Sequence, residues 1–341
     1  MIEKLNLACP FCGEPLHNTS YILKCKKCCV EWPVKNGIVN FITKDILNNV
    51  FKENELMDVN NRISRQNWKS VLSNHPSRVI NDYLFEILNV DQANFELLIS
   101  SLKSEGVALE IGTRMGNLTR ILSRKMKEVI SMDPSEEWLS FVQHILRQEE
   151  IKNVTLVRSE INIMPIPSNS IDFVLINCLA NKTNLIDLKY NSYTQLSKIY
   201  RILRPGGMIC LALENEISLL KFFDINPSNT GQNKFDIIKN ISFFIQKVKD
   251  KFLLFNIVKY FDKMLNKMKF QDVKVYGVFP NHRYPKFVLP IDSKVVSYFQ
   301  RNFNDIGSHF RNDLICKFLE IVGKENFMIP SFVVLGEKTV I

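Results

Sequence analysis

The stretch "ALEIGTRMGN", residues 108–117, joins an apolar run to an acid and two glycines four positions apart. The run is typical of a buried strand, and a helical pattern begins near Leu118. Glycine lets the backbone approach a ligand closely, and a helix N-terminus favours an anionic group. Ligands of open α/β sheets bind at the carboxyl ends of the strands, where this loop falls, so the stretch predicts a nucleotide-cofactor loop.

Strand and helix patterns alternate after this loop. The helical patterns are "NLTRILSRKM", "SEEWLSFVQHILRQE" and "YTQLSKIYRIL", and the strand patterns are "EVISMD", "VTLVRS", "IDFVLIN" and "MICLALEN". This alternation predicts an α/β fold with a parallel sheet covered by helices on both faces. Farther along the chain, "QDVKVYGVFP" and "SFVVLGEK" predict two more strands.

The 341 residues, 46% hydrophobic and 23% charged, are typical of a globular protein. No run approaches the ~18 to 20 apolar residues of a membrane span, and the N-terminus lacks a signal-peptide core, so we expect a cytoplasmic protein. The net charge is +9, and residues 232–290 hold twelve Lys and Arg against four Asp. Such a basic patch attracts nucleic acid, an anionic membrane surface or a phosphorylated substrate, and charge alone does not choose among them.

Cys9 and Cys12 form one C-x2-C pair, and Cys25 and Cys28 form a second after twelve intervening residues. Two such pairs supply the four thiolates of a tetrahedral zinc site. A closed four-cysteine site leaves no open coordination position, so we expect the zinc to be structural. Cys29 is an alternative ligand to Cys28, and disulfide pairing is disfavoured without a secretion signal. The module is too small to fold without such a staple.

The residues of the glycine loop distinguish between two classes of cofactor. A dinucleotide fingerprint starting at Gly112 needs glycines at 114 and 117, where Arg114 and Asn117 stand. The loop instead resembles the first motif of class I S-adenosylmethionine-dependent methyltransferases, an acid followed by G-x-G-x-G. Glu110, Gly112 and Gly116 match this motif, and Arg114 replaces the middle glycine.

Later segments resemble the other motifs of that family in the same order. Asp133 in "VISMDPS" ends the next strand, where an acid can accept hydrogen bonds from both ribose hydroxyls. In "SEINIMPIPSNSIDFVLIN", Glu160 and Ile161 occupy the places that meet the adenine. Pro165 and Asp172 are in register with the family's L-P-F-x-x-x-x-F-D. "IYRILRPGGMICLALEN" is similar to the family's helix, turn and fifth strand.

The resemblance implies a Rossmann-like, seven-stranded methyltransferase sheet with helices on both faces, ending in an antiparallel pair of strands. It implies S-adenosylmethionine as cofactor. The cofactor-binding residues that we predict from it are Glu110, Gly112, Thr113, Gly116, Asp133, Pro134, Glu160, Ile161 and Asn177.

We predict three regions. Residues 1–44 form a zinc ribbon, 45–104 a helical linker or cap, and 105–341 the methyltransferase domain with a helical insertion at 216–269. The first region resembles short zinc ribbons that occur alone as methyltransferase partners or fused ahead of methyltransferase domains, including ribosomal RNA guanine methyltransferases. Such a ribbon either grips substrate or braces the domain.

The methyl acceptor is less well determined by the sequence. A general base is needed only when the acceptor is protonated. "INCLAN" after the fourth strand lacks the D/N-P-P-Y/F of enzymes that methylate amino groups of bases or glutamine, which disfavours those acceptors. In "YGVFPNHRYPKFVLP", residues 276–290, His282 is the candidate catalytic base, because histidine takes a proton near neutral pH. A surface histidine hydrogen-bonded in a loop is the more frequent alternative.

A basic, phenylalanine-rich helical stretch at 236–269 has apolar residues at helical spacing. We favour packing on the protein itself, as a lid over the acceptor site, over contact with a membrane surface or nucleic acid. We therefore expect methyl transfer to oxygen or nitrogen of a small-molecule, peptide or saccharide acceptor. The alternatives are a ribosomal or transfer RNA base methyltransferase and a non-catalytic binding module that has lost the cofactor.

Overall fold

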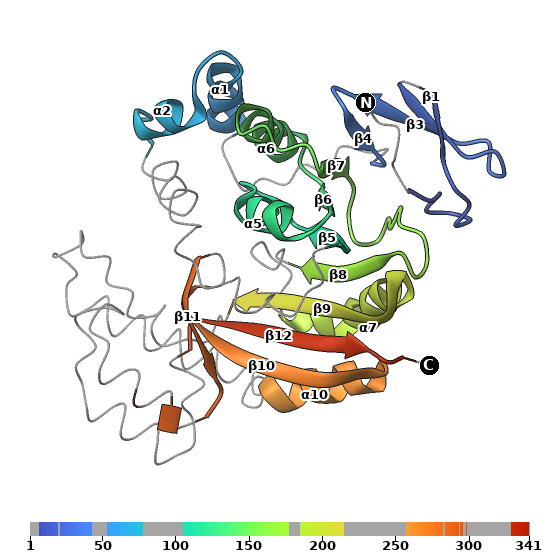
Figure 1. Cartoon of the computed structure of the whole chain (residues 1–341), viewed down its shortest axis with the longest axis vertical. Coiled ribbons are helices and arrows are strands. Elements are labelled where there is room, and N and C mark those ends of the chain that lie inside the picture. The colour runs from blue at the N-terminus through green and yellow to red at the C-terminus, as the bar shows by residue number, and fades with distance from the viewer. Residues whose placement is uncertain are drawn as a thin grey trace.

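The computed structural model describes residues 7–19, 21–42, 53–77, 105–176, 185–214, 257–281, 284–292 and 329–340, with single positions between 294 and 298. Its strands form a twelve-stranded sheet with helices on both faces (Figure 1). The predicted α/β architecture is confirmed.

Five parallel strands make the centre of the sheet. In chain order they are β5 (Val107–Ile111), β6 (Glu128–Asp133), β7 (Val154–Arg158), β8 (Ile171–Ile176) and β9 (Leu203–Glu214). Helix α5 (Asn117–Lys125) connects β5 to β6, α6 (Glu136–Gln148) connects β6 to β7, and α7 (Leu185–Ile202) precedes β9. The strand order is β7-β6-β5-β8-β9, so the direction of winding reverses between β5 and β8. In such sheets the ligand crevice lies at the carboxyl ends of the strands beside this reversal.

The C-terminal part of the chain completes the sheet with antiparallel strands. β12 (Ser331–Lys338) lies between β9 and β10 (Phe270–Asn281) and runs antiparallel to both. β11 (Tyr284–Pro290) adds a hairpin strand to β10. Numbered along the chain without β11, the seven strands from β5 onward stand in the order 3-2-1-4-5-7-6. The expected seven-stranded core and its closing antiparallel pair are therefore present.

The sheet is longer than the sequence predicts because the cysteine module joins it. β1 (His17–Thr19), β2 (Ile22–Lys24), β3 (Glu31–Lys35) and β4 (Ile38–Asn40) form an antiparallel meander. β4 then pairs in parallel with β7. An exposed edge of β7 would present unpaired backbone groups, and β4 covers that edge.

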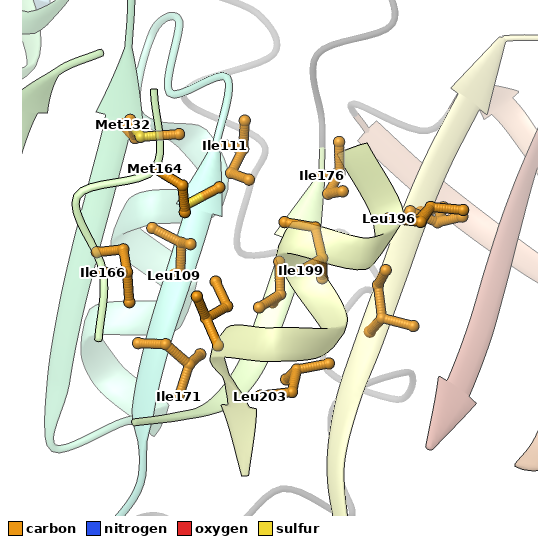
Figure 2. Close-up of a cluster of buried hydrophobic side chains, with 14 of the residues drawn as sticks. Leu109, Ile111, Met132, Met164, Ile166, Ile171, Ile176, Leu196, Ile199 and Leu203 are labelled. Carbon is orange, nitrogen blue, oxygen red and sulfur yellow. The ribbon is translucent and has the colours of Figure 1, made fainter. Parts of the chain in front are cut away.

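The two faces of the sheet are covered by different helices. On one face, side chains from β5, β8 and α7 share one buried cluster with the segment 164–166, and Figure 2 shows Met164 and Ile166 beside Leu109 of β5. Helix α10 (Ile257–Lys267) packs on the same face through Phe261 and Leu265. On the other face, the apolar side of α5 packs against Ala108, Val129 and Phe173. The core is thus continuous on both sides of the strands that carry the glycine loop.

Two short helices from the predicted cap pack against α6. They are α1 (Glu53–Ile63) and α2 (Trp68–Ser73). Their buried side chains share a cluster with the apolar side of α6. Gln148 at the end of α6 accepts from the Trp68 N–H at 2.9 Å and donates to the carbonyl oxygens of Ile63 and Gln66, each at 2.9 Å. These contacts attach the helical pair to the sheet domain.

The described end of the predicted helical stretch is α10 and the turn that follows it. Phe261, Leu265 and Met268 are buried against the sheet, whereas Lys263 and Lys267 are exposed. Within residues 261–269, the apolar side is therefore covered by the protein itself, and residues 216–256 lie outside the described part. Among the helices that the structure describes, none has the length and apolar character needed to cross a membrane.

Candidate functional site

The glycine loop connects β5 to α5 through three residues with positive φ. These are Gly112 at 89°, Arg114 at 47° and Gly116 at 77°. The Gly112 N–H donates to the Met132 carbonyl at 2.8 Å, and the Gly116 N–H donates to the Thr113 carbonyl at 2.9 Å. A Cβ atom on Gly116 would lie 2.9 Å from Val142 of α6. Both φ and close packing therefore require glycine at 116, whereas Arg114 accepts a left-handed conformation that costs roughly 1 kcal/mol.

Glu110, at the start of the loop motif, is buried between β5, β6 and α5. Its Oε2 accepts hydrogen bonds from the hydroxyl groups of Thr119 and Ser131, the second at 2.5 Å. Its Oε1 is also buried and has no hydrogen-bond partner among the described residues. Burial raises the pKa of Glu110 from its ordinary 4.5 to about 7, and the two hydroxyl donors oppose that rise only in part.

Asp133, at the end of β6, joins the glycine loop to the loop that follows its own strand. Its Oδ2 accepts from the Arg114 N–H at 3.0 Å, and its Oδ1 accepts from the Ser135 N–H at 2.9 Å. The residue is 5% exposed. Burial raises the pKa of Asp133, while the two N–H donors and the nearby Arg114 charge act in the opposite direction.

The turn after β7 lies beside the end of β6. The Ser159 N–H donates to the Asp133 carbonyl at 3.1 Å. The turn is closed by the Ile163 N–H, which donates to the Glu160 carbonyl at 2.8 Å, and by the Ser159 hydroxyl, which donates to the Ile163 carbonyl at 2.7 Å. Glu160 and Ile161 stand in this turn. The loops that carry the predicted cofactor residues after β5, β6 and β7 therefore meet at one edge of the sheet.

The four predicted metal ligands also converge. The sulfur atoms of Cys9, Cys12, Cys25 and Cys28 all lie within 4.8 Å of one another. A tetrahedral zinc with Zn–S of about 2.3 Å needs sulfur atoms roughly 3.8 Å apart, so the arrangement fits a structural zinc. The Cys28 N–H donates to Cys25 Sγ at 3.3 Å and lowers the pKa of Cys25 to about 7, which favours the thiolate that a metal needs.

Each cysteine pair is followed by a residue with positive φ, a conformation that zinc knuckles favour. Gly13 has φ 77° and Cys29 has φ 55°. Cys29 is exposed, and its sulfur lies 3.8 Å from the Lys26 carbonyl, outside the cluster of four. Of the two alternative ligands, the structure therefore selects Cys28.

Comparison with known proteins agrees with this geometry. A family model described as a methyltransferase domain matches residues 109–211, from β5 to β9. This segment is therefore similar in sequence to methyltransferase domains. The match begins one residue before Glu110 and includes the glycine loop, Asp133 and the turn with Glu160 and Ile161.

Individual proteins are similar to the chain at low identity. The "Putative methyltransferase YqeM" of Bacillus subtilis (strain 168) is 23% identical over 159 residues, which are 43% of this chain and 63% of that protein. A phosphoethanolamine N-methyltransferase 2 of Haemonchus contortus, solved with phosphomonomethylethanolamine and S-adenosylhomocysteine, is 15% identical with a TM-score of 0.39, covering 75% of this chain and 52% of that one. The YcgJ protein of Bacillus subtilis is 12% identical with a TM-score of 0.40, covering 73% and 99%. The chain thus spans less than two thirds of the first two of these relatives.

Two predicted residues of the methyltransferase domain cannot be placed. Asn177 and the candidate base His282 lie outside the described residues. Pro134 is placed, and its carbonyl accepts from Arg158 Nε at 3.1 Å. Asp172 does not lie at the cofactor edge. Its Oδ2 accepts from the Val107 N–H at 2.7 Å and from Arg204 at 2.6 Å, so it fastens the opposite ends of the strands.

Sequence reasoning missed Asn117, Thr119 and Ser131. Asn117 opens α5, is buried, and its Oδ1 has no hydrogen-bond partner among the described residues. Thr119 and Ser131 hold Glu110 in place. Ser131 left a signal in the sequence, because it is a polar residue inside the apolar run "EVISMD". Asn117 left another, because it directly follows the last glycine of the loop.

Proposed function

We propose that the protein binds S-adenosylmethionine and transfers its methyl group to oxygen or nitrogen of a small-molecule, peptide or saccharide acceptor. The observation that carries the cofactor assignment is the cluster of buried polar atoms at the glycine loop. Glu110 Oε1, Thr113 Oγ1 and Asn117 Oδ1 are covered from solvent and lack partners among the described residues. Because buried polar atoms are rarely left unpaired, these three atoms are suited to contact a ligand.

The residues at this edge fit the parts of S-adenosylmethionine. Glu110 and Asn117 offer acceptor oxygens to a cationic amino group. Asp133 offers a carboxylate to the ribose hydroxyls, and the turn with Glu160 and Ile161 offers an apolar wall and polar atoms to the adenine. When bound, the cofactor supplies an electrophilic methyl on a sulfonium, and the chain's own task is to orient it toward the acceptor.

The acceptor assignment rests on the sequence that follows β8. "INCLAN" differs from the D/N-P-P-Y/F pattern of enzymes that act on amino groups of bases or glutamine. His282, which lies outside the described residues and stands between β10 and β11 in the sequence, is the proposed base where the acceptor carries a proton.

Calorimetry with S-adenosylhomocysteine tests the cofactor assignment. We expect binding to folded, zinc-loaded protein at micromolar concentration. No heat of binding at high micromolar concentration would instead support a non-catalytic methyltransferase-fold module.

The acceptor class is tested by turnover. Protein and S-adenosylmethionine are mixed with a small-molecule extract or with total RNA, and released S-adenosylhomocysteine is measured. We expect turnover with the extract alone. Turnover with RNA, together with retention on a polyanion column that falls steeply with salt, would support the RNA alternative.

A further inference from the structure

The turn that carries Glu160 and Ile161 is attached to the zinc ribbon at both ends. Before the turn, the carbonyl of Arg158 accepts from the N–H of Phe41, which follows β4, at 2.9 Å. After the turn, the carbonyl of Pro165 accepts from the N–H of Ala8 at 2.9 Å. The residues on either side of the proposed adenine-binding turn therefore each accept a hydrogen bond from the backbone of the ribbon.

Ala8 is part of the first zinc knuckle. It directly precedes the ligand Cys9, whose N–H donates to the Glu14 carbonyl at 2.8 Å and whose carbonyl accepts from the Gly13 N–H at 2.8 Å. Ala8 also forms a bridge with Pro15 across the knuckle. A metal that holds Cys9 thus holds the donor that bonds to Pro165.

Apolar packing connects the same two parts. Leu7, Trp32 and Phe41 of the ribbon share a buried cluster with Met164 and Ile166, which follow the turn. Figure 2 shows the side chains of Met164 and Ile166 directed into the core of the sheet domain near Leu109. The segment after the turn therefore touches the ribbon and the cofactor strand together. Ile161 and Ile163 of the turn itself are partly buried against this cluster.

A second contact reaches the end of β6. Lys35 in the ribbon pairs with Glu136 at 2.7 Å, and Arg158 pairs with the same carboxylate at 3.3 Å. Glu136 directly follows Ser135, whose N–H holds the Asp133 carboxylate. The ribbon therefore contacts the neighbours of both proposed nucleoside-binding loops.

From these contacts we propose that the ribbon is a working part of the cofactor site: Ala8 and Phe41 position the turn at 159–163, so zinc binding and cofactor binding strengthen each other. The inference rests on the proposed function. A module of this size needs its metal to stay folded, so loss of zinc removes both backbone donors and uncovers Met164 and Ile166. The turn then loses its fixed position. By linkage, a bound cofactor must tighten zinc binding by the same factor by which zinc tightens the cofactor.

The first test compares Cys25→Ser with Cys29→Ser. Both remove one thiol of the second knuckle, but Cys29 lies outside the four-cysteine cluster. We expect Cys25→Ser to lose zinc and to bind S-adenosylhomocysteine about 5- to 150-fold more weakly, the range usual for coupled sites. Cys29→Ser should keep both zinc and affinity. Zinc content, circular dichroism and calorimetry provide the readouts, and wild-type affinity in folded, zinc-free Cys25→Ser would overturn the proposal.

The second test needs no variant, so a folding failure of Cys25→Ser does not affect it. Zinc affinity of the wild-type protein is measured by chelator competition, with and without saturating S-adenosylhomocysteine. We expect zinc to bind more tightly with the ligand present, and unchanged zinc affinity would overturn the proposal. Ligand binding without any effect of zinc would overturn the coupling while the proposed function stands. Failure of zinc-loaded protein to bind the ligand would overturn the proposed function and the coupling with it.

Discussion

Asp133 has a structural task beside the ribose contact that the family resemblance implies. Both of its carboxylate oxygens accept backbone hydrogen bonds, from Arg114 of the glycine loop and from Ser135. The carboxylate therefore fixes the loop against the end of β6, and a cofactor would meet an acid already held in place. This dual task makes Asp133 the residue whose substitution is most informative.

We expect Asp133→Ala to weaken S-adenosylhomocysteine binding about 10- to 100-fold, because hydrogen bonds to a charged group contribute roughly 1.5–3 kcal/mol. The fold should be retained, since the residue lies at a strand end. Asp133→Asn keeps one acceptor oxygen, so its affinity for S-adenosylhomocysteine should lie between those of the wild type and Asp133→Ala. Calorimetry measures the affinity and circular dichroism the fold. Unchanged affinity in folded Asp133→Ala would refute the assignment.

Glu110 makes stability depend on pH. Its pKa is about 7 in the folded protein and 4.5 ordinarily, so the folded state holds the proton more tightly. Its contribution to stability is therefore complete below pH 4.5 and is lost as pH rises through about 7. Glu110→Gln cannot ionise and still offers an oxygen to Thr119 and Ser131. The free energy of unfolding of the wild type, relative to this variant, should fall by roughly 3 kcal/mol between pH 4.5 and pH 8.

Urea unfolding of both proteins at several pH values measures this difference. A difference that does not change between pH 4.5 and pH 8 would mean that the pKa of Glu110 is not raised in the folded state, because hydrogen-bond donors offset the effect of burial.

At the scale of elements, the contact between the glycine loop and α6 depends on the absence of a side chain at Gly116. Val142 of α6 occupies the space that a Cβ would need. The next loop residue toward the N-terminus, Met115, is buried in the cluster formed by α1, α2 and α6. Met115 of the glycine loop therefore belongs to the same apolar cluster as the helical pair of the predicted cap.

Gly116→Ala should destabilise the protein by about 2–4 kcal/mol, from the positive φ and the clash with Val142 together. Gly206→Ala is the matched control, because Gly206 has φ 75° but its nearest new neighbour would be 3.6 Å away. It should cost only the backbone part, about 1–2 kcal/mol. Thermal unfolding of both variants measures the difference between their losses of stability. Equal losses would show that Val142 moves to make room for the methyl group.

At the scale of the whole molecule, the ribbon and the sheet domain share one sheet and one apolar cluster. Phe41 is buried in that cluster and its ring lies 5.0 Å from that of Trp32. Phe11 contacts the same Trp32 from outside and is 69% exposed. Substitution of Phe41 therefore tests the packing between the ribbon and the sheet domain, whereas substitution of Phe11 tests only the surface of the ribbon.

Phe41→Ala should lower the free energy of unfolding by about 3–5 kcal/mol, the usual cost of removing a buried phenylalanine. Phe11→Ala should cost less than about 1 kcal/mol. Denaturant unfolding followed by circular dichroism compares them. Similar small losses in both variants would mean that the ribbon is joined to the domain by its hydrogen bonds alone.

Features that depend on neighbouring residues were predicted from the sequence. The alternating strands and helices, the glycines at 112 and 116, and the two cysteine pairs follow from spacing and backbone freedom within a few residues. Asp133 and the turn with Glu160 were predicted from the order of the family's motifs along the chain, and β6 and β7, which precede them, lie next to β5 in the sheet. The resemblance to methyltransferases could therefore be recognised from the sequence alone.

Only the tertiary structure decided how these parts act on one another. The pairing of β4 with β7 cannot be predicted from a local pattern, because pairing between distant strands depends on which edge of the sheet is left open. Nor does the sequence around Glu110 reveal that Thr119 and Ser131 surround it, or that its pKa rises, because burial is a property of the assembled core. The sequence by itself thus indicated the glycine loop and the two cysteine pairs, and the long-range contacts of the fold decided that the cysteine module packs against the loops of the proposed cofactor site.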